Sequence, residues 1–265
     1  MSTNQLAHDY SRTGAAWEEG PGRVYNRLSE ELVARVPGGV AGDVLDVGAG
    51  TGAASRAAAS AGAARVVAID FAPGLLAVNA HERPPAVVGD ARVLPFRDEA
   101  FDAVVAAFSL NHLSDPAIAL AEARRVLRPG GGLAASAYAT DDTHPVKQIV
   151  TTVCTAHGWT PADWYAQLQQ EAMPRLATPE RAEAVASGVL PGAHAEIARI
   201  PLPEFDGRAL VAWRLGMAQF APFIATLEPA EREALIDEAV SQVGDDPLVR
   251  SIVVLTWTKP STTFT

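Results

Sequence analysis

The stretch that most constrains the fold is residues 44–52, Val-Leu-Asp-Val-Gly-Ala-Gly-Thr-Gly, where an apolar run meets alternating glycines. Val44, Leu45 and Val47 suit a strand that is buried on both faces, as in a parallel sheet covered by helices. The glycines allow a tight turn and let main-chain N–H groups approach a ligand, because they carry no Cβ. A helix of small residues is expected over residues 53–61, and its N-terminus completes a cradle for a small molecule.

The pattern of this turn is compatible with two kinds of ligand. Gly48, Gly50 and Ala53 fit the G-x-G-x-x-G/A fingerprint of dinucleotide-binding folds. Asp46, however, lies at the mouth of the predicted strand, where a carboxylate would repel a pyrophosphate and attract a cationic ligand. The turn therefore favours a cationic ligand, and a nicotinamide dinucleotide stays the alternative.

The run that begins at Asp46 reads Asp-x-Gly-x-Gly-x-Gly, and it resembles the signature of class I S-adenosylmethionine (SAM) dependent methyltransferases. SAM carries an ammonium and a sulfonium group and no phosphate, which agrees with an acid at this position. The resemblance implies that SAM is the cofactor and that Asp46, Gly48, Ala49 and Gly50 are among the residues that bind it.

A second candidate contact follows the strand predicted over residues 65–69. Asp70 ends this strand about 20 residues after the glycine turn, the spacing at which nucleoside-binding folds place a carboxylate for the ribose hydroxyls. Phe71 is expected to cover one face of the adenine. The alternative is that Asp70 only caps the helix predicted from about Leu75.

Two further segments extend the resemblance. The short strand expected from Ala86 ends in Gly89-Asp90-Ala91, which is similar to the third motif of the family, whose acid accepts from the adenine amino group. Asp90 and Ala91 are therefore expected to contact the cofactor. Residues 126–131, Val-Leu-Arg-Pro-Gly-Gly, resemble a family marker that forms a turn into the fifth strand, residues 133–138.

The fourth predicted strand, residues 103–107, opens into Phe108-Ser109-Leu110-Asn111-His112-Leu113. The C-terminal end of such a strand faces the ligand crevice, so Phe108 is expected to contact the cofactor. Methyltransferases that act on adenine or cytosine amino groups carry an Asn/Asp-Pro-Pro-aromatic run here, and this sequence has none. It resembles instead the small-molecule branch, which includes the methyltransferases of ubiquinone and menaquinone biosynthesis.

His112 is the candidate catalytic residue. It follows the fourth strand, and its imidazole titrates near neutrality, as a general base for a hydroxyl or an acidic carbon requires. The alternative is a histidine that packs or begins a helix. Tyr138, at the end of strand five, and His144, in the following segment, are weaker candidates.

The resemblance implies an α/β fold with a Rossmann-like seven-stranded sheet, its last strand antiparallel, flanked by helices. Tyr10 or Trp17 would close over the cofactor, or the leading segment is only a terminus with a packed aromatic residue. The segment after strand five would cap the acceptor substrate, or it forms ordinary additional helices. The expected parts of this single domain are an N-terminal lid or helices (1–36), a SAM-binding core (40–138), a cap insertion (140–192) and C-terminal strands and helices (193–259).

Composition narrows the partners and the compartment. The formal net charge is −10 over 265 residues, which argues against nucleic acid or an anionic membrane as the main partner. Cys154 is the single cysteine, so neither an intramolecular disulfide nor a cysteine metal cluster is expected, and no metal ligands are predicted. Without a signal peptide or a long apolar run, the prediction is a cytoplasmic protein. Only two lysines against many arginines and alanines indicate a GC-rich bacterial genome.

The function predicted from these features is methyl transfer from SAM to a small-molecule acceptor, a secondary metabolite or an isoprenoid-type compound. Aromatic residues after strand five favour a partly apolar acceptor, whereas Arg175, Arg181, Arg208 and Arg214 suit an anionic head group. A protein that binds SAM without methyl transfer, as a regulator or a cyclase, and a nicotinamide-dependent oxidoreductase are the alternatives. Whether oxygen, nitrogen or carbon is methylated, and whether the chain forms a homo-oligomer, stays open.

Overall fold

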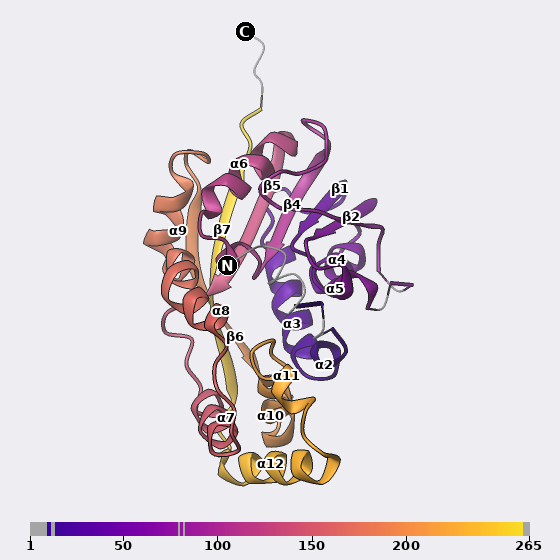
Figure 1. Ribbon diagram of the computed structural model, residues 1–265. Helices are drawn as coiled ribbons and strands as arrows, with labels where there is room; N and C mark the ends of the chain where they lie inside the picture. The colour runs from indigo at the N-terminus through magenta and orange to yellow at the C-terminus, as the bar shows by residue number, and fades with distance from the viewer. Residues whose placement is uncertain (1–9, 12–13, 79, 82, 262–265) are drawn as a thin grey trace.

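The fold is a seven-stranded sheet with helices on both faces (Figure 1). The computed structural model describes residues 10–11, 14–78, 80–81 and 83–261. The strand order is β3-β2-β1-β4-β5-β7-β6, with β7 antiparallel to both of its neighbours and the other pairs parallel. The predicted fold class is therefore confirmed. The strands are β1 (Asp43–Val47), β2 (Arg65–Asp70), β3 (Ala86–Val88), β4 (Phe101–Ala107), β5 (Leu127–Tyr138), β6 (His194–Leu202) and β7 (Leu248–Thr258).

Helices precede, connect and follow these strands, and several start at a proline, whose fixed φ and missing N–H suit the first helical turn. The α-helices are α2 (Gly14–Glu19), α3 (Pro21–Val33), α4 (Ala53–Ser60), α5 (Pro73–Ala77), α6 (Pro116–Val126), α7 (Pro145–Ala156), α8 (Asp163–Gln167), α9 (Pro179–Ala186), α10 (Gly207–Leu215), α11 (Ala221–Ile224) and α12 (Pro229–Gln242). The 3₁₀-helices η1 (Leu110–His112) and η3 (Met173–Leu176) and the π-helix η2 (Leu168–Ala172) complete the set.

Two apolar cores lie on opposite faces of the sheet, because successive side chains of a strand point to opposite sides. Val44 belongs to the core shared with α3, α4, α7, α10 and α12, whereas its neighbour Leu45 belongs to the core shared with α6 and α9. Both side chains have no exposed surface. A strand covered on both faces has little room for polar side chains, which explains the apolar run that the sequence shows there.

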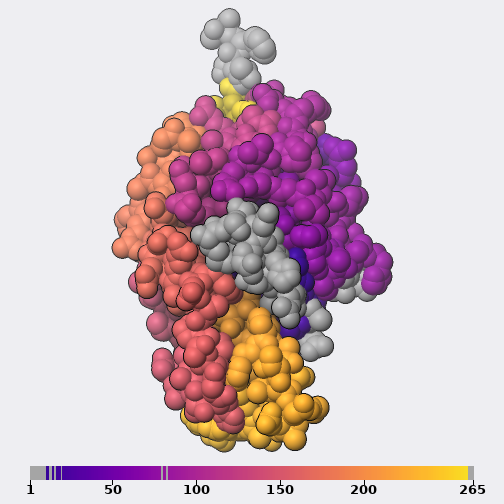
Figure 2. Space-filling view, viewed as in Figure 1, coloured from indigo at the N-terminus to yellow at the C-terminus, as the bar shows by residue number. Residues whose placement is uncertain are grey.

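The segment after β5 contributes to two different parts of the molecule. Helix α7 packs with α10 and α12, and these three form the lower end of the molecule in Figures 1 and 2. Helix α9 instead returns to the sheet and contacts β6 and β7. Residues 140–192 are therefore divided between a helical group that includes C-terminal helices and a helix that covers the sheet.

The predicted turn before strand five differs in the structure. Strand β5 already begins at Leu127, which pairs with Phe101, and the next pair of the ladder joins Ala103 to Gly132. The residues between form a bulge, anchored by Arg128, whose guanidinium lies 2.6 Å from Asp102. The ion pair and the bulge together extend a strand that the Pro-Gly-Gly run alone does not predict.

Gly132 tests how tightly this bulge packs. A Cβ on Gly132 would lie 2.1 Å from the Pro37 carbonyl oxygen, so Gly132→Ala is expected to lower the free energy of unfolding by ~1–3 kcal/mol. Urea denaturation measures the change. Gly188→Ala is the matched control, since no atom of the described residues lies within 4 Å of its Cβ position. Equal midpoints for the two variants would contradict the prediction.

Candidate functional site

A cavity lies at the carboxyl ends of β1, β2, β4 and β5. Its volume is about 620 Å³, within the range of about 300–1,000 Å³ that is typical of small-molecule sites. Tyr10, α8 and α10 also supply lining residues. Ligands of open α/β sheets bind at this edge, so we take the cavity as the candidate active site.

The glycine turn is tied to the end of β2. The N–H groups of Gly48 and Ala49 donate to the Ile69 carbonyl at 2.8 and 3.1 Å, and the N–H of Gly50 donates to Asp70 Oδ2 at 2.8 Å. Gly48 has a φ of +70°, and a Cβ there would lie 2.2 Å from Ser109 Cβ. Only glycine fits this close approach, and all three turn residues line the cavity.

Asp46 is fully buried beneath the turn. Its Oδ2 accepts a hydrogen bond from Ser55 Oγ at 2.6 Å, while Oδ1 has no partner among the described residues. Burial raises the pKa of this carboxyl to about 7, against a partly offsetting effect of the Ser55 hydrogen bond. Because Asp46 lines the cavity, the orphaned oxygen suits a cationic group of a ligand, which would restore the ionised form.

Asp70 holds the turn rather than the next helix. Its two carboxylate oxygens accept from the main-chain N–H groups of Gly50 and Ala72, both at 2.8 Å. The N-cap position of α5 is Ala72, and no side chain caps that helix. Burial raises the pKa of Asp70. Its oxygens retain lone pairs for further donors, and both Asp70 and Phe71 line the cavity.

Asp90 and Ala91 follow β3 and also line the cavity. The Asp90 carboxylate pairs with Arg92, whose Nη2 lies 2.6 Å from Oδ2. This hydrogen-bonded ion pair lowers the pKa of Asp90, so the acid is ionised at neutral pH and able to accept further hydrogen bonds.

Phe108 begins an aromatic wall at the end of β4. Its φ is +54°, a conformation that a bulky residue rarely adopts. The ring lies 4.6 Å from the Tyr138 ring and 5.1 Å from the Tyr25 ring, centroid to centroid. Trp17 in turn packs on Tyr25 at 4.7 Å. Since all four residues line the cavity, the unusual backbone positions Phe108 within a continuous aromatic surface.

His112 ends η1 and faces the cavity beside Tyr10 and Trp164. Its Nδ1 is 3.0 Å from the Tyr10 hydroxyl, and the Tyr10 ring lies 5.7 Å from that of Trp164. Burial lowers the pKa of His112 to about 4, although a hydrogen bond to the Phe108 main chain opposes the shift. The imidazole is therefore neutral at pH 7. Of the leading segment expected to form a lid, residues 1–9 and 12–13 lie outside the described residues.

Of the two weaker catalytic candidates, Tyr138 and His144, only Tyr138 lines the cavity. Burial raises the pKa of the Tyr138 hydroxyl. His144 instead caps α7, where its Nδ1 accepts from the Val146 N–H at 3.2 Å, and it does not line the cavity. Its place in the sequence alone does not distinguish a cap from a catalytic residue.

Two basic residues that line the cavity were not predicted from the sequence. Arg250 and Lys147 line it together with Arg214, which was the only one of the four candidate arginines to do so. Arg208, for example, instead pairs with exposed Glu233 and Asp237. The available signal was an arginine within the last strand, in the run Leu-Val-Arg-Ser-Ile-Val-Val-Leu, whose other residues are apolar except for one serine.

Other classes of site find no support in the described part of the chain. There, no group of three or more His, Cys, Asp or Glu side chains could hold a metal ion. Among these same residues, no helix is both long and apolar enough to cross a membrane.

Comparisons with known proteins agree with the geometry. Residues 45–135 match a methyltransferase domain family. The chain is 39% identical over 150 residues to a demethylmenaquinone methyltransferase of Renibacterium salmoninarum, a match covering 56% of this chain and 62% of the relative. It is 36% identical over 173 residues to that of Mycolicibacterium gilvum, covering 65% and 68%. The matched part thus spans about two thirds of the length of these curated relatives.

Solved structures share the fold. The phosphoethanolamine N-methyltransferase 2 of Haemonchus contortus, in complex with SAM, superposes with a TM-score of 0.51 at 21% identity, covering 84% of this chain and 49% of that one. The chain belongs to the family of class I S-adenosyl-L-methionine-dependent methyltransferases.

Proposed function

We propose that this protein transfers the methyl group of SAM to a small-molecule acceptor that binds in the same cavity. The observation that carries the proposal is that one cavity is lined both by the residues of the SAM motifs and by the aromatic wall of Tyr25, Phe108 and Tyr138. Cofactor and acceptor would therefore lie in one cavity, as a direct transfer requires.

The cavity residues that belong to the predicted SAM motifs suit this cofactor. Asp46 Oδ1, which is buried and lacks a partner among the described residues, would accept from the ammonium group. Asp70 would accept from the ribose hydroxyls, and Asp90 from the adenine amino group. Phe71 would cover the adenine, and the N–H groups from Gly48 to Gly50 line the turn beside the cofactor.

The reaction asks mainly for alignment. When bound, SAM supplies a methyl group on a sulfonium that is already a good leaving group. The chain must hold the acceptor atom in line and exclude water, a positional contribution of up to roughly 7–11 kcal/mol. Phe108, which is expected to contact the cofactor, packs on Tyr138, so the two rings would form an apolar surface from the cofactor to the acceptor. We propose that His112 accepts the proton of the acceptor. Its pKa of about 4 leaves the imidazole neutral at pH 7 but makes it a weak base, so the proton would leave as the methyl group is transferred, when the acceptor's proton is most acidic.

The acceptor class is narrowed by the relatives. Both are named demethylmenaquinone methyltransferases, which favours an aromatic, quinone-type acceptor for this chain. The aromatic side chains that line the cavity agree with a ring-shaped, largely apolar substrate. This supports the small-molecule prediction and leaves the methylated atom open.

Binding of SAM and transfer of its methyl group are tested separately. Calorimetric titration with SAM and with NADH measures cofactor choice, and incubation with methyl-labelled SAM and a panel of quinols and phenols measures transfer. Micromolar SAM binding with label in an acceptor is the expected result. SAM binding with no labelled product across the panel would favour the alternative of a regulator or cyclase.

Asp70 is expected to be essential for cofactor binding, because it faces the cavity and holds Gly50. We expect Asp70→Ala to weaken SAM affinity at least about tenfold by calorimetry, the loss of a hydrogen bond to an ionised group. Asp98→Ala is the control, since Asp98 is exposed and pairs only with Arg125 among the described residues. Equal affinity in both variants would remove Asp70 from the SAM site.

Because the pKa of Asp46 lies near neutrality, we expect SAM binding to depend on pH. Its pKa of about 7 in the free protein means that the ionised form, which attracts the ammonium group, gains population as pH rises through 7 and is lost as pH falls. We expect SAM affinity to drop about tenfold between pH 8 and pH 6. Asp46→Asn cannot ionise, so its pH profile gives the contribution of all other groups. Parallel profiles for the two proteins would contradict the prediction.

A substitution of His112 is expected to affect catalysis without affecting cofactor binding. His112→Ala is expected to lower turnover about 10²-fold, as for loss of a proton acceptor, with little change in SAM affinity. Tyr10→Phe, which keeps the ring and removes the hydroxyl near Nδ1, separates the proton-accepting role from the positioning of His112. His157→Ala is the control, because His157 pairs with exposed Glu238. Unchanged turnover in His112→Ala would exclude this residue from the mechanism.

A further inference from the structure

The inner end of the cavity carries an excess of positive charge. Lys147, Arg214 and Arg250 line it and are called here the cationic end. Asp142 Oδ2 lies 2.6 Å from both Lys147 Nζ and Arg250 Nη2. No ion pair of Arg214 is found among the described residues, so Asp142 pairs with two of the three cations and leaves the third without a counter-charge. The neighbouring charge of Arg250 adds to burial in lowering the pKa of Lys147, even though Asp142 opposes the shift.

Arg250 is held in one orientation. Its guanidinium lies between the rings of Tyr138 and Trp213, at 4.2 and 4.4 Å from the centroids. Nε and Nη2 donate to Asp142 at 3.0 and 2.6 Å. With both faces and one edge of the planar group occupied, Nη1 is the guanidinium nitrogen that has no hydrogen-bond partner among the described residues. The side chain is only 2% exposed.

The unpaired polar atoms at this end include several that can only donate. Arg250 Nη1, Arg214 Nε and Trp213 Nε1 are buried and hydrogen-bond to no atom of the described residues, and all three side chains line the cavity. Guanidinium and indole N–H groups have no acceptor capacity. Buried polar groups in native proteins nearly always find a partner. The chemistry that satisfies this set is a hydrogen-bond acceptor with negative charge.

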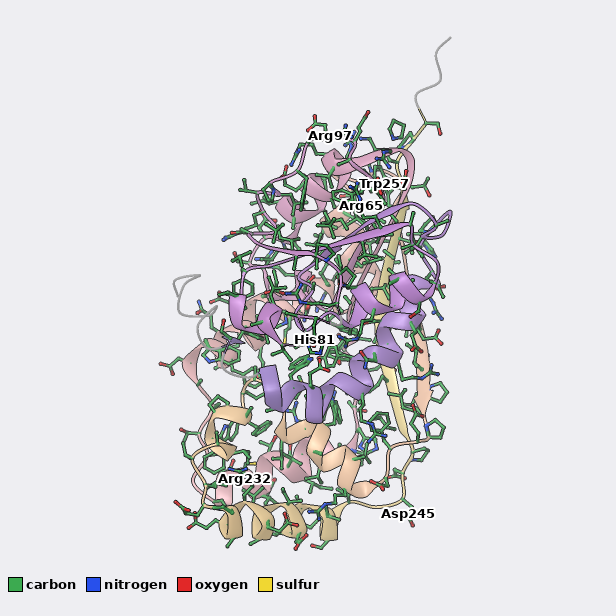
Figure 3. The ribbon with its side chains drawn as sticks, turned by 90° about the vertical axis from the view of Figure 1, so that its right-hand side faces the viewer. Arg65, His81, Arg97, Arg232, Asp245 and Trp257 are labelled. Carbon is green, nitrogen blue, oxygen red and sulfur yellow. The ribbon has the colours of Figure 1, made fainter. Side chains whose placement is uncertain are left out.

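The cationic end lies at the same edge of the sheet as the SAM motifs. Arg65, at the start of β2, and Trp257, near the end of antiparallel β7, lie toward the upper edge of the sheet in Figure 3. Arg250, near the start of β7, therefore lies toward the opposite ends of the strands. It is two residues before Ile252, which pairs with Tyr138 at the end of β5. Tyr138 in turn packs on Phe108 of the proposed methyl-transfer region. A ligand can thus contact both regions.

We infer that the cationic end binds an anionic group, a carboxylate or a phosphate, carried by the acceptor substrate. The inference rests on the proposed function, because it assigns the acceptor's place in the same cavity. The aromatic wall would hold the ring of this acceptor, and Arg250 Nη1, Arg214 and Lys147 would hold its charged group. The acceptor is then an aromatic anion rather than a neutral ring compound.

Three naphthalene probes of matched shape test the inference. Calorimetry of the full chain with S-adenosylhomocysteine present would compare 2-naphthoate and 2-naphthyl phosphate with the uncharged 2-naphthamide. We expect at least one anion to bind tenfold or more tightly than the amide, and the stronger anion identifies carboxylate or phosphate as the group. Equal affinity for the three probes, or no binding of either anion, would overturn the inference.

Arg214→Gln connects this preference to the cationic end. The substitution removes the charge of a residue that is not part of the Asp142 pairing, and we expect the preference for the anion to fall at least tenfold. Arg208→Gln is the matched control, on the same helix with exposed partners. Thermal melting checks folding, and Lys147→Gln serves if Arg214→Gln does not fold.

Failure of this inference is distinguishable from failure of the proposed function. Loss of S-adenosylhomocysteine affinity in Arg214→Gln, with the anion preference intact, would place the cofactor's own carboxylate at the cationic end and overturn the inference. Wild-type protein that methylates neutral acceptors as well as anionic ones would also overturn it while the proposed function stands. Absence of SAM binding by the wild type would overturn both.

Discussion

The hydrogen bonds between the glycine turn and the end of β2 support the rest of the site. Three successive N–H groups, from Gly48 to Gly50, point at the Ile69 carbonyl and the Asp70 carboxylate. This arrangement bends the chain sharply after β1, starts α4 beside the sheet and leaves the turn open on its ligand side. The same contacts bury Asp70 and hold the turn above the buried Asp46. The turn that lines the cavity is thus continuous with β1, which pairs with both β2 and β4.

Much of this was predictable from local sequence, because the relevant signals are local. A strand buried on both faces must be apolar, and a turn with positive φ and no room for a Cβ must be glycine, so β1 and its turn are readable from nine residues. The places of Asp70 and Asp90 at the cavity were predictable, because Asp70 ends β2 and Asp90 follows β3. The carboxyl ends of these parallel strands lie at the same side of the sheet. The number of strands and the antiparallel direction of the last strand followed from the family resemblance that these motifs carry.

The acceptor side was less predictable, because its contacts join distant parts of the chain. The partner of Arg250 is Asp142, which is 108 positions away, and no local pattern marks such a pair. The low pKa of His112 depends on burial by residues that include Tyr10, also distant in sequence. Likewise, α7 packs with α10 and α12, which lie more than 50 positions further along the chain. Tertiary packing decided each of these.

The reversed direction of β7 also bears on how the protein acquires its site during synthesis. Strand β7 is inserted between β5 and β6, so Arg250 reaches the cavity only when the last strand of the fold pairs with strands formed much earlier. Pairings across such sequence distances form slowly. A growing chain that has exposed the glycine turn, β2 and β4 already holds the elements of a cofactor cradle. It completes the opposite wall only after β7 has also been synthesised.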